Sequence, residues 1–91
     1  MKSIIQDEKK CYVCGQYHWL ENHHIIYGTA NRKKSEKHGL KLWLCTEHHR
    51  GTKGVHNNRE LDLTLKRLAQ TVFEETHTRD EFRNIFGKSY L

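Results

Sequence analysis

Two pairs of metal-ligand residues constrain the fold of this chain more than any other feature of its sequence. Cys11 and Cys14 form a Cys-x-x-Cys pair, and Cys45 and His48 form a Cys-x-x-His pair that begins 31 residues after Cys14. Two such pairs on separate turns are typical of a closed tetrahedral zinc site, and thiolate and imidazole ligands favour zinc over magnesium or calcium. We therefore predict a structural zinc ion bound by Cys11, Cys14, Cys45 and His48.

Two alternatives to this ligand set stay open from the sequence. His49 directly follows His48 and is the other candidate for the fourth ligand. A Cys-x-x-Cys pair also occurs in redox proteins, but no thioredoxin-like strand–helix pattern surrounds Cys11. Residues 1–10 turn charged after two isoleucines, so we interpret them as a short frayed lead-in and not as a secretory signal. A reducing, cytoplasmic compartment is therefore expected, where cysteines at fixed spacing usually bind metal.

The predicted fold class is α+β, in one small domain over residues 1–91. A core of this size supplies little stability alone, and a bound metal ion can add to it. The metal-centred part is expected over residues 11–58, with a β-prone stretch that ends at Tyr27 and an alternating strand over 40–45. Residues 28–39 between them are predicted to form a polar, basic loop. A short helical turn is expected to follow the second strand.

Two helices are predicted over residues 59–91, as a cover for the metal-centred part. The first has an apolar stripe at helical spacing, and Asn57 with Glu60 resembles a capping box at its start. The second begins with a clearer capping box, Thr78 with Glu81, and Gly87 is expected to end it. The apolar faces consist of Leu61, Leu65, Leu68, Ala69, Val72 and Phe73 in the first helix and of Phe82, Ile85 and Phe86 in the second.

The positive charge is concentrated in the first 54 residues. This part has ten Lys and Arg against five Asp and Glu, whereas the rest of the chain has six of each sign. A basic field beside a His/Cys cluster favours a polyanionic partner, and nucleic acid is the commonest one. We expect this chain to bind DNA and not a membrane. The alternative is that the basic loop is solvated and serves solubility only. The residues expected to contact phosphates are Arg32, Lys33, Lys34, Lys37, Arg50 and Lys53.

Histidines outside the predicted zinc site form a second candidate cluster. His23 and His24 are adjacent, so their side chains point to opposite faces of a regular strand. One can bind an ion while the other approaches a water molecule, which is the division of labour in metal-assisted hydrolysis. His49 and His56 follow downstream. The remaining histidines lack this context and are expected at the surface: His18, His38 and His77.

The run LENHHII, followed by a basic segment and a strand that ends in LCTEHH, resembles the HNH endonuclease superfamily. The resemblance covers residues 11–58 and is closest to the zinc-knuckle branch, which includes small phage-associated and recombination-associated nucleases. It implies a ββα-metal (His-Me finger) module, in which a two-stranded hairpin and a helix surround one divalent ion. The implied activity is a DNA endonuclease that leaves a 3′-hydroxyl and a 5′-phosphate, and the implied biology is phage recombination or DNA processing.

The resemblance also assigns roles by position. His24 matches the general base, His23 a metal ligand, and His49 the distal ligand that opens the helix of the motif, while His56 is the candidate third ligand. The family's asparagine before the second strand is absent, so Asn31 or backbone groups would have to brace the loop that orients the base. An all-histidine site accepts Zn²⁺, Ni²⁺ or Mn²⁺, and Mg²⁺ more weakly. The rival function is a non-catalytic adaptor or regulator that binds nucleic acid or protein on the same scaffold.

Overall fold

The computed structural model describes residues 1–91 and contains two strands and four helices. The strands β1 (Leu20–His24) and β2 (Lys41–Cys45) form an antiparallel hairpin, in which Asn22 is opposite Trp43 and His24 is opposite Lys41. None of the helices has the length and apolar character needed to cross a bilayer. The predicted α+β class is confirmed, with the helices α1 (Asn31–His38), α2 (Thr46–His49), α3 (Arg59–Phe73) and α4 (Arg79–Phe86).

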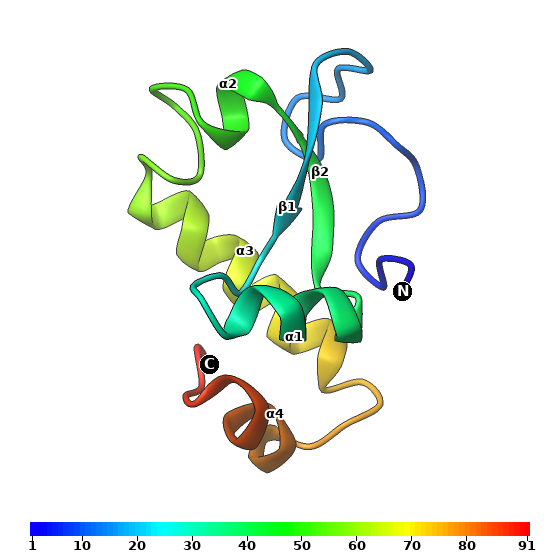
Figure 1. Ribbon diagram of the computed structural model, residues 1–91, viewed down its shortest axis with the longest axis vertical. Coiled ribbons are helices and arrows are strands. Elements are labelled where there is room, and N and C mark those ends of the chain that lie inside the picture. The colour runs from blue at the N-terminus through cyan, green and yellow to red at the C-terminus, as the bar shows by residue number, and fades with distance from the viewer.

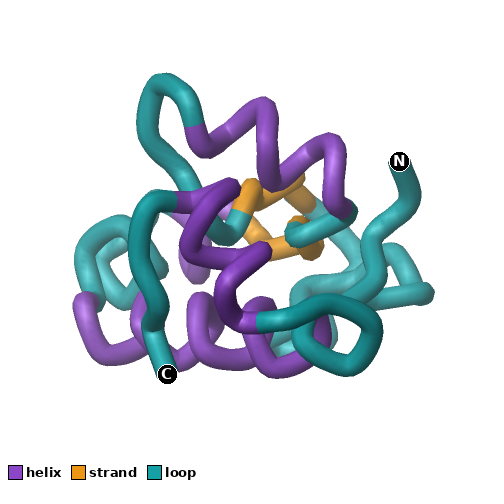
Figure 2. Tube along the Cα trace, turned by 90° about the horizontal axis from the view of Figure 1, so that it is seen from below, coloured by secondary structure: helices purple, strands orange, loops and turns teal.

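The core lies between the hairpin and the two C-terminal helices. In Figure 1, α1 crosses the foot of the hairpin, α3 runs behind it and α4 lies below, and Figure 2 shows helices on two sides of the strands. The ring centroids of Phe73 and Phe82 are 5.5 Å apart, and those of Phe82 and Phe86 are 4.7 Å apart. With the exception of Val72, the apolar residues predicted for the two helices are confirmed as part of the core or packed against it, together with the buried hairpin residues Leu42 and Leu44.

The prediction of a loop over residues 28–39 is wrong, because Asn31–His38 form helix α1. This segment has no apolar stripe. A small polar residue attaches it to the chain that follows β1. The buried Ser35 hydroxyl donates to the Ile26 carbonyl at 2.7 Å and accepts from the Ile26 N–H at 3.0 Å. Gly39 ends the helix with φ 71°, a left-handed conformation that glycine adopts without strain.

Residues 1–10 form no strand, but they are bonded to the sheet and do not project from it as the frayed lead-in expected. They run along the side of β2 that β1 leaves free. The Ile4 N–H donates to the Gly39 carbonyl at 2.9 Å, and the Gln6 side-chain oxygen accepts from the Trp43 N–H at 2.8 Å. The Gln6 side chain therefore accepts a hydrogen bond that the backbone of a third strand would otherwise accept. Periodicity in the sequence cannot reveal such a contact.

Side-chain caps begin both C-terminal helices, one of them at a different residue from the prediction. The capping box between Thr78 and Glu81 is confirmed, and Gly87 ends α4 at φ 86°. Helix α3, however, is capped by Asn58, whose side chain accepts a first-turn N–H at 3.1 Å. The box proposed at Asn57 is wrong because the helix begins one residue later.

Candidate metal centres

Three cysteines and one histidine converge near the top of the hairpin. Their ligand atoms all lie within 4.8 Å of one another, a group that could hold a metal ion such as zinc. The sulfurs of Cys14 and Cys45 are 3.9 Å apart, and Cys45 Sγ is 3.2 Å from His48 Nδ1. Two sulfurs on a tetrahedral zinc with Zn–S bonds of about 2.3 Å are separated by about 3.8 Å. The four donors Cys11, Cys14, Cys45 and His48 therefore fit one ion.

Local turns bring these ligands together. The Cys11 N–H donates to the Gln16 carbonyl, and Gly15, at φ 78°, closes the turn by donating to the Cys11 carbonyl. Burial raises the pKa of the Cys11 thiol, but hydrogen bonds from the N–H groups of Cys14 and Cys45 outweigh it and lower the pKa to about 6. The surroundings of Cys11 thus favour its thiolate, which is the form that binds metal.

A second group, of imidazoles alone, lies beside the first. The ligand atoms of His23, His49 and His56 also lie within 4.8 Å of one another. The two Nε2 atoms of His49 and His56 are 3.2 Å apart, close to the roughly 3.3 Å expected for two imidazoles on one tetrahedral zinc. The structure therefore separates the two adjacent histidines of α2, with His48 among the cysteines and His49 among the imidazoles.

His23 carries the clearest sign of a missing partner. Its side chain is buried and its Nε2 has no hydrogen-bond partner, although buried ring nitrogens are almost always paired. Burial lowers the pKa of His23 to about 3, with smaller contributions from His49 and His56. A neutral imidazole with a free nitrogen, aimed at two other imidazoles, is the ligand form that a divalent ion requires.

A tight loop after α2 places His56 over His49. The Val55 N–H donates to the His48 carbonyl at 2.8 Å, and the Asn57 amide donates to the backbone carbonyls of residues 50 and 51. A Cβ at Gly54 would lie only 2.7 Å from the His49 carbonyl, so this approach needs glycine. His49 ends α2, and the prediction that it opens a helix is wrong.

A carboxylate orients His49 from the same face of β1. Glu21 Oε1 accepts from His49 Nδ1 at 2.6 Å, and the pKa of Glu21 is lowered chiefly by this bond. His49 therefore keeps its Nε2 lone pair for the cluster, as in metal sites where a carboxylate fixes the tautomer of a ligand histidine. The sequence reasoning missed Glu21, although its spacing of two from His23 places both on one face of a strand.

His24 points away from the imidazole group, as alternation along β1 predicts. Its Nε2 lies 3.0 Å from Glu36 Oε1, on α1. Hydrogen bonds from Lys41 and then His24 lower the pKa of Glu36 to about 2, so this carboxylate stays ionised at neutral pH. Glu36 was also missed, and it is the side chain that contacts His24, at the position for which Asn31 had been considered. No pattern in the sequence indicated it, because its segment was interpreted as a loop.

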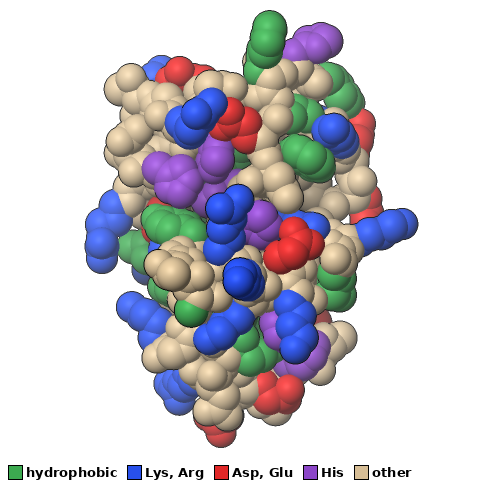
Figure 3. All heavy atoms as spheres, in the orientation of Figure 1, with side chains coloured by type: hydrophobic (Ala, Val, Ile, Leu, Met, Phe, Trp, Pro, Cys, Tyr) green, Lys and Arg blue, Asp and Glu red, His purple; other side chains and the backbone are tan.

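A hollow of about 260 Å³ joins these groups. It is lined by Asn22, His23, His24, Tyr27, Arg32, His49 and His56. Figure 3 shows histidine side chains on this face with Lys and Arg side chains around them. His24 and the three imidazoles therefore border one space, in a basic surrounding.

The six predicted phosphate-contacting cations are unequally placed. Arg32 lines the hollow, and Lys33 and Lys37 are exposed on α1. Lys34 instead donates to the Ile85 carbonyl at 2.8 Å and ties α1 to α4. The remaining two lie beyond the hairpin, where Arg50 pairs with Glu21 and Lys53 is exposed.

Three histidines were expected at the surface. His18 and His77 are exposed there. His38 is instead half-buried, and its ring centroid lies 5.9 Å from that of Phe73 and 6.3 Å from that of Phe86. Burial lowers the pKa of His38. Its position follows from α1, whose last turn packs toward the C-terminal helices.

Comparisons with known proteins add no relative. Scans of protein-family models, of curated proteins and of solved structures each return no match to this chain. Its functional interpretation therefore depends on the two side-chain clusters and their surroundings. One is a thiolate-rich group suited to a structural ion, and the other is an imidazole group open to a basic hollow.

Proposed function

We propose that this chain is a metal-dependent DNA endonuclease with an HNH-type ββα-metal site, in which a separate zinc ion stabilises the fold. One observation carries the proposal: three imidazoles converge on one point, and a fourth imidazole on the opposite face of β1 borders the same hollow. A non-catalytic binding protein whose fold is stabilised by zinc would need the cysteine group only. The additional triad and the carboxylate-held His24 are what metal-assisted hydrolysis requires.

The triad would hold the catalytic divalent ion. His23, His49 and His56 would each offer one imidazole nitrogen to this ion. When bound, such an ion supplies positive charge to the phosphate and its leaving oxygen. Arg32 borders the hollow and adds a fixed positive charge beside the phosphate.

His24 acts as the general base. Glu36 accepts the Nε2 proton of His24, which leaves Nδ1 as the free lone pair. The attacking water gives its proton to this nitrogen as its oxygen bonds to phosphorus. The bond from phosphorus to the 3′ oxygen breaks, and a proton from solvent completes the 3′-hydroxyl beside a 5′-phosphate.

The test combines metal counting with cleavage. Zinc-loaded protein is incubated with supercoiled, linear, single-stranded and branched DNA in the presence of Mn²⁺, Ni²⁺, Mg²⁺ or additional Zn²⁺. His24→Ala is compared with His18→Ala, a matched control because His18 is exposed and outside both clusters. General-base catalysis contributes about 10²- to 10⁴-fold, so His24→Ala is expected to lose that much rate and keep both ions and its fold.

Two outcomes would overturn the proposal. Cleavage by His24→Ala at the parent rate would remove His24 from the role of base. A parent chain that binds one ion, at the cysteine group, and cuts none of the substrates would favour the rival adaptor function.

A further inference from the structure

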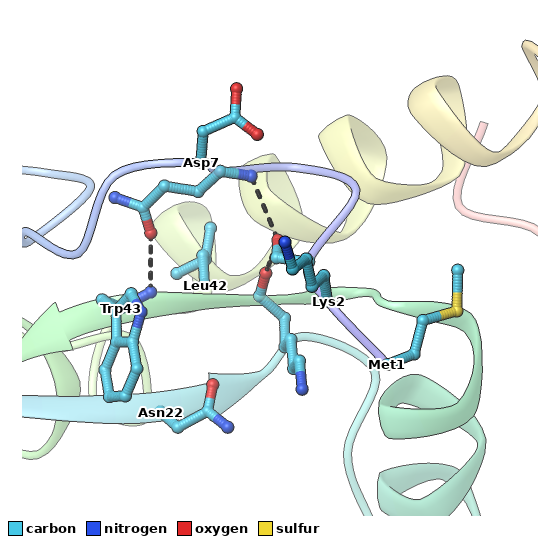
Figure 4. Close-up of a pocket in the computed structure, with 9 residues that line it drawn as sticks. Met1, Lys2, Asp7, Asn22, Leu42 and Trp43 are labelled. Carbon is cyan, nitrogen blue, oxygen red and sulfur yellow. Dashed lines mark hydrogen bonds between the residues drawn. The ribbon is translucent and has the colours of Figure 1, made fainter.

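The largest cavity of the molecule lies outside both metal clusters. It measures about 730 Å³ and is bounded by the N-terminal segment on one side and the outward face of the hairpin on the other. Figure 4 shows Trp43 and Asn22 on this face, side by side from the two strands, with the N-terminal segment running past β2. The labelled lining residues are Met1, Lys2, Asp7, Asn22, Leu42 and Trp43.

One residue is shared by the lining of this cavity and the lining of the proposed active site. Asn22 lines both the cavity and the imidazole hollow, and its side chain is exposed. His24 follows on the same face of β1, about 7 Å further along the strand. A strand whose phosphate lies at the hollow can therefore reach Asn22 and its cross-strand partner Trp43 with the adjacent nucleotide.

The chemistry of the cavity suits a nucleobase. Trp43 is only half-buried and offers an indole for stacking, and the Asn22 amide can both donate to and accept from a base edge. The positive charge around it exceeds the negative. Lys2 lines the cavity, against the single carboxylate of Asp7. The Lys9 ammonium lies over one face of the Trp43 ring, 4.5 Å from its centroid, so a base would stack on the other face.

We propose that this cavity binds the unpaired nucleotide next to the scissile phosphate, with its base stacked on Trp43 and its edge read by Asn22. The proposal rests on the proposed nuclease function and specifies its substrate as nucleic acid with at least one unpaired base at the cut. A base inside a regular duplex is stacked on both faces and cannot reach an indole in a cavity of this shape.

The binding test uses fluorescein-labelled 12-nucleotide DNA, single-stranded or as a duplex, with zinc-loaded protein in which His24→Ala prevents cleavage. Loss of a base–aromatic stack weakens binding by about 5- to 150-fold. Trp43→Leu is expected to weaken single-strand binding by that factor and to leave duplex binding unchanged, while Trp43→Phe restores most of it. Trp19→Leu is the matched control, because Trp19 is 79% exposed and outside the cavity.

A spectroscopic measurement reports on the same contact without altering it. The chain has two tryptophans, so in Trp19→Phe the only indole emission is that of Trp43. Single-stranded DNA is expected to quench this emission on binding, and the duplex is not. Single-strand binding that Trp43→Leu leaves unchanged, with no quenching, would overturn this inference while the nuclease proposal stands. Failure to bind either form of DNA would overturn both.

Discussion

Replacing Glu21 with glutamine tests whether the imidazole cluster is built for a metal ion. Glu21 Oε1 accepts from His49 Nδ1 at 2.6 Å, so the carboxylate fixes the ring and leaves Nε2 for the cluster. Glutamine has the same shape but no charge, and its amide can present either a donor or an acceptor to His49. The change therefore weakens the orientation of one ligand and leaves the ligand itself in place.

The expected magnitude follows from this geometry. Loss of a partner that orients a metal-bound histidine lowers metal affinity by about 10- to 100-fold. The ion pair of Glu21 with Arg50 is lost as well, but the Arg50 side chain is 66% exposed, so this pair contributes no more than about 1 kcal/mol to folding. Glu21→Gln should therefore reduce affinity at the imidazole site and leave the fold and the cysteine-bound zinc unchanged.

Isothermal titration of Ni²⁺ or Mn²⁺ into zinc-loaded protein measures this affinity. Glu8→Gln is the control, since Glu8 is an exposed carboxylate that is hydrogen-bonded to Tyr17 and belongs to neither cluster. The reasoning is refuted if Glu21→Gln binds the second ion as tightly as the parent. It is also refuted if neither protein takes up a second ion.

Three further changes test the parts of the fold that hold the site. Gly54→Val places carbon against the His49 carbonyl, where a Cβ would lie at 2.7 Å, so it should weaken binding of the second ion in the same titration. Cys45→Ser removes a buried ligand of the zinc group, and thermal melts followed by circular dichroism should lose their cooperative transition. Phe82→Ala empties a fully buried position and should lower the free energy of unfolding by about 3–5 kcal/mol in urea titrations.

Each of these expectations has a contradicting result. Tight second-ion binding by Gly54→Val would mean that the loop can shift without cost. A Cys45→Ser variant that melts like the parent would show that zinc is not needed for the fold. A loss below about 1 kcal/mol for Phe82→Ala would place that ring outside the core.

The parts of the fold that the sequence predicted are those determined by local chemistry. The spacing of Cys11, Cys14, Cys45 and His48 indicated one ligand group, and apolar periodicity indicated α3 and α4 as cover. Thr78 caps α4 through contacts within four residues, which the sequence displays directly. Strand alternation likewise predicted that His23 and His24 face opposite ways.

The features that were missed depend on contacts between distant segments. Helix α1 has no apolar stripe and is fixed by Ser35, whose partner Ile26 is nine residues away. Gln6 completes the edge of β2 through a side-chain bond across 37 residues. Glu21 and Glu36 bond to His49 and His24 across 28 and 12 residues, so neither carboxylate was evident from the sequence before the hairpin and α1 were placed.

Anomalous diffraction from crystals grown with Zn²⁺ and soaked in Mn²⁺ or Ni²⁺ tests the central claim most directly. Two separate peaks are expected, one among the three cysteines and His48 and the other among His23, His49 and His56. The second peak should disappear in His23→Ala and persist in His18→Ala. A single peak at the cysteines under every metal condition would contradict the account.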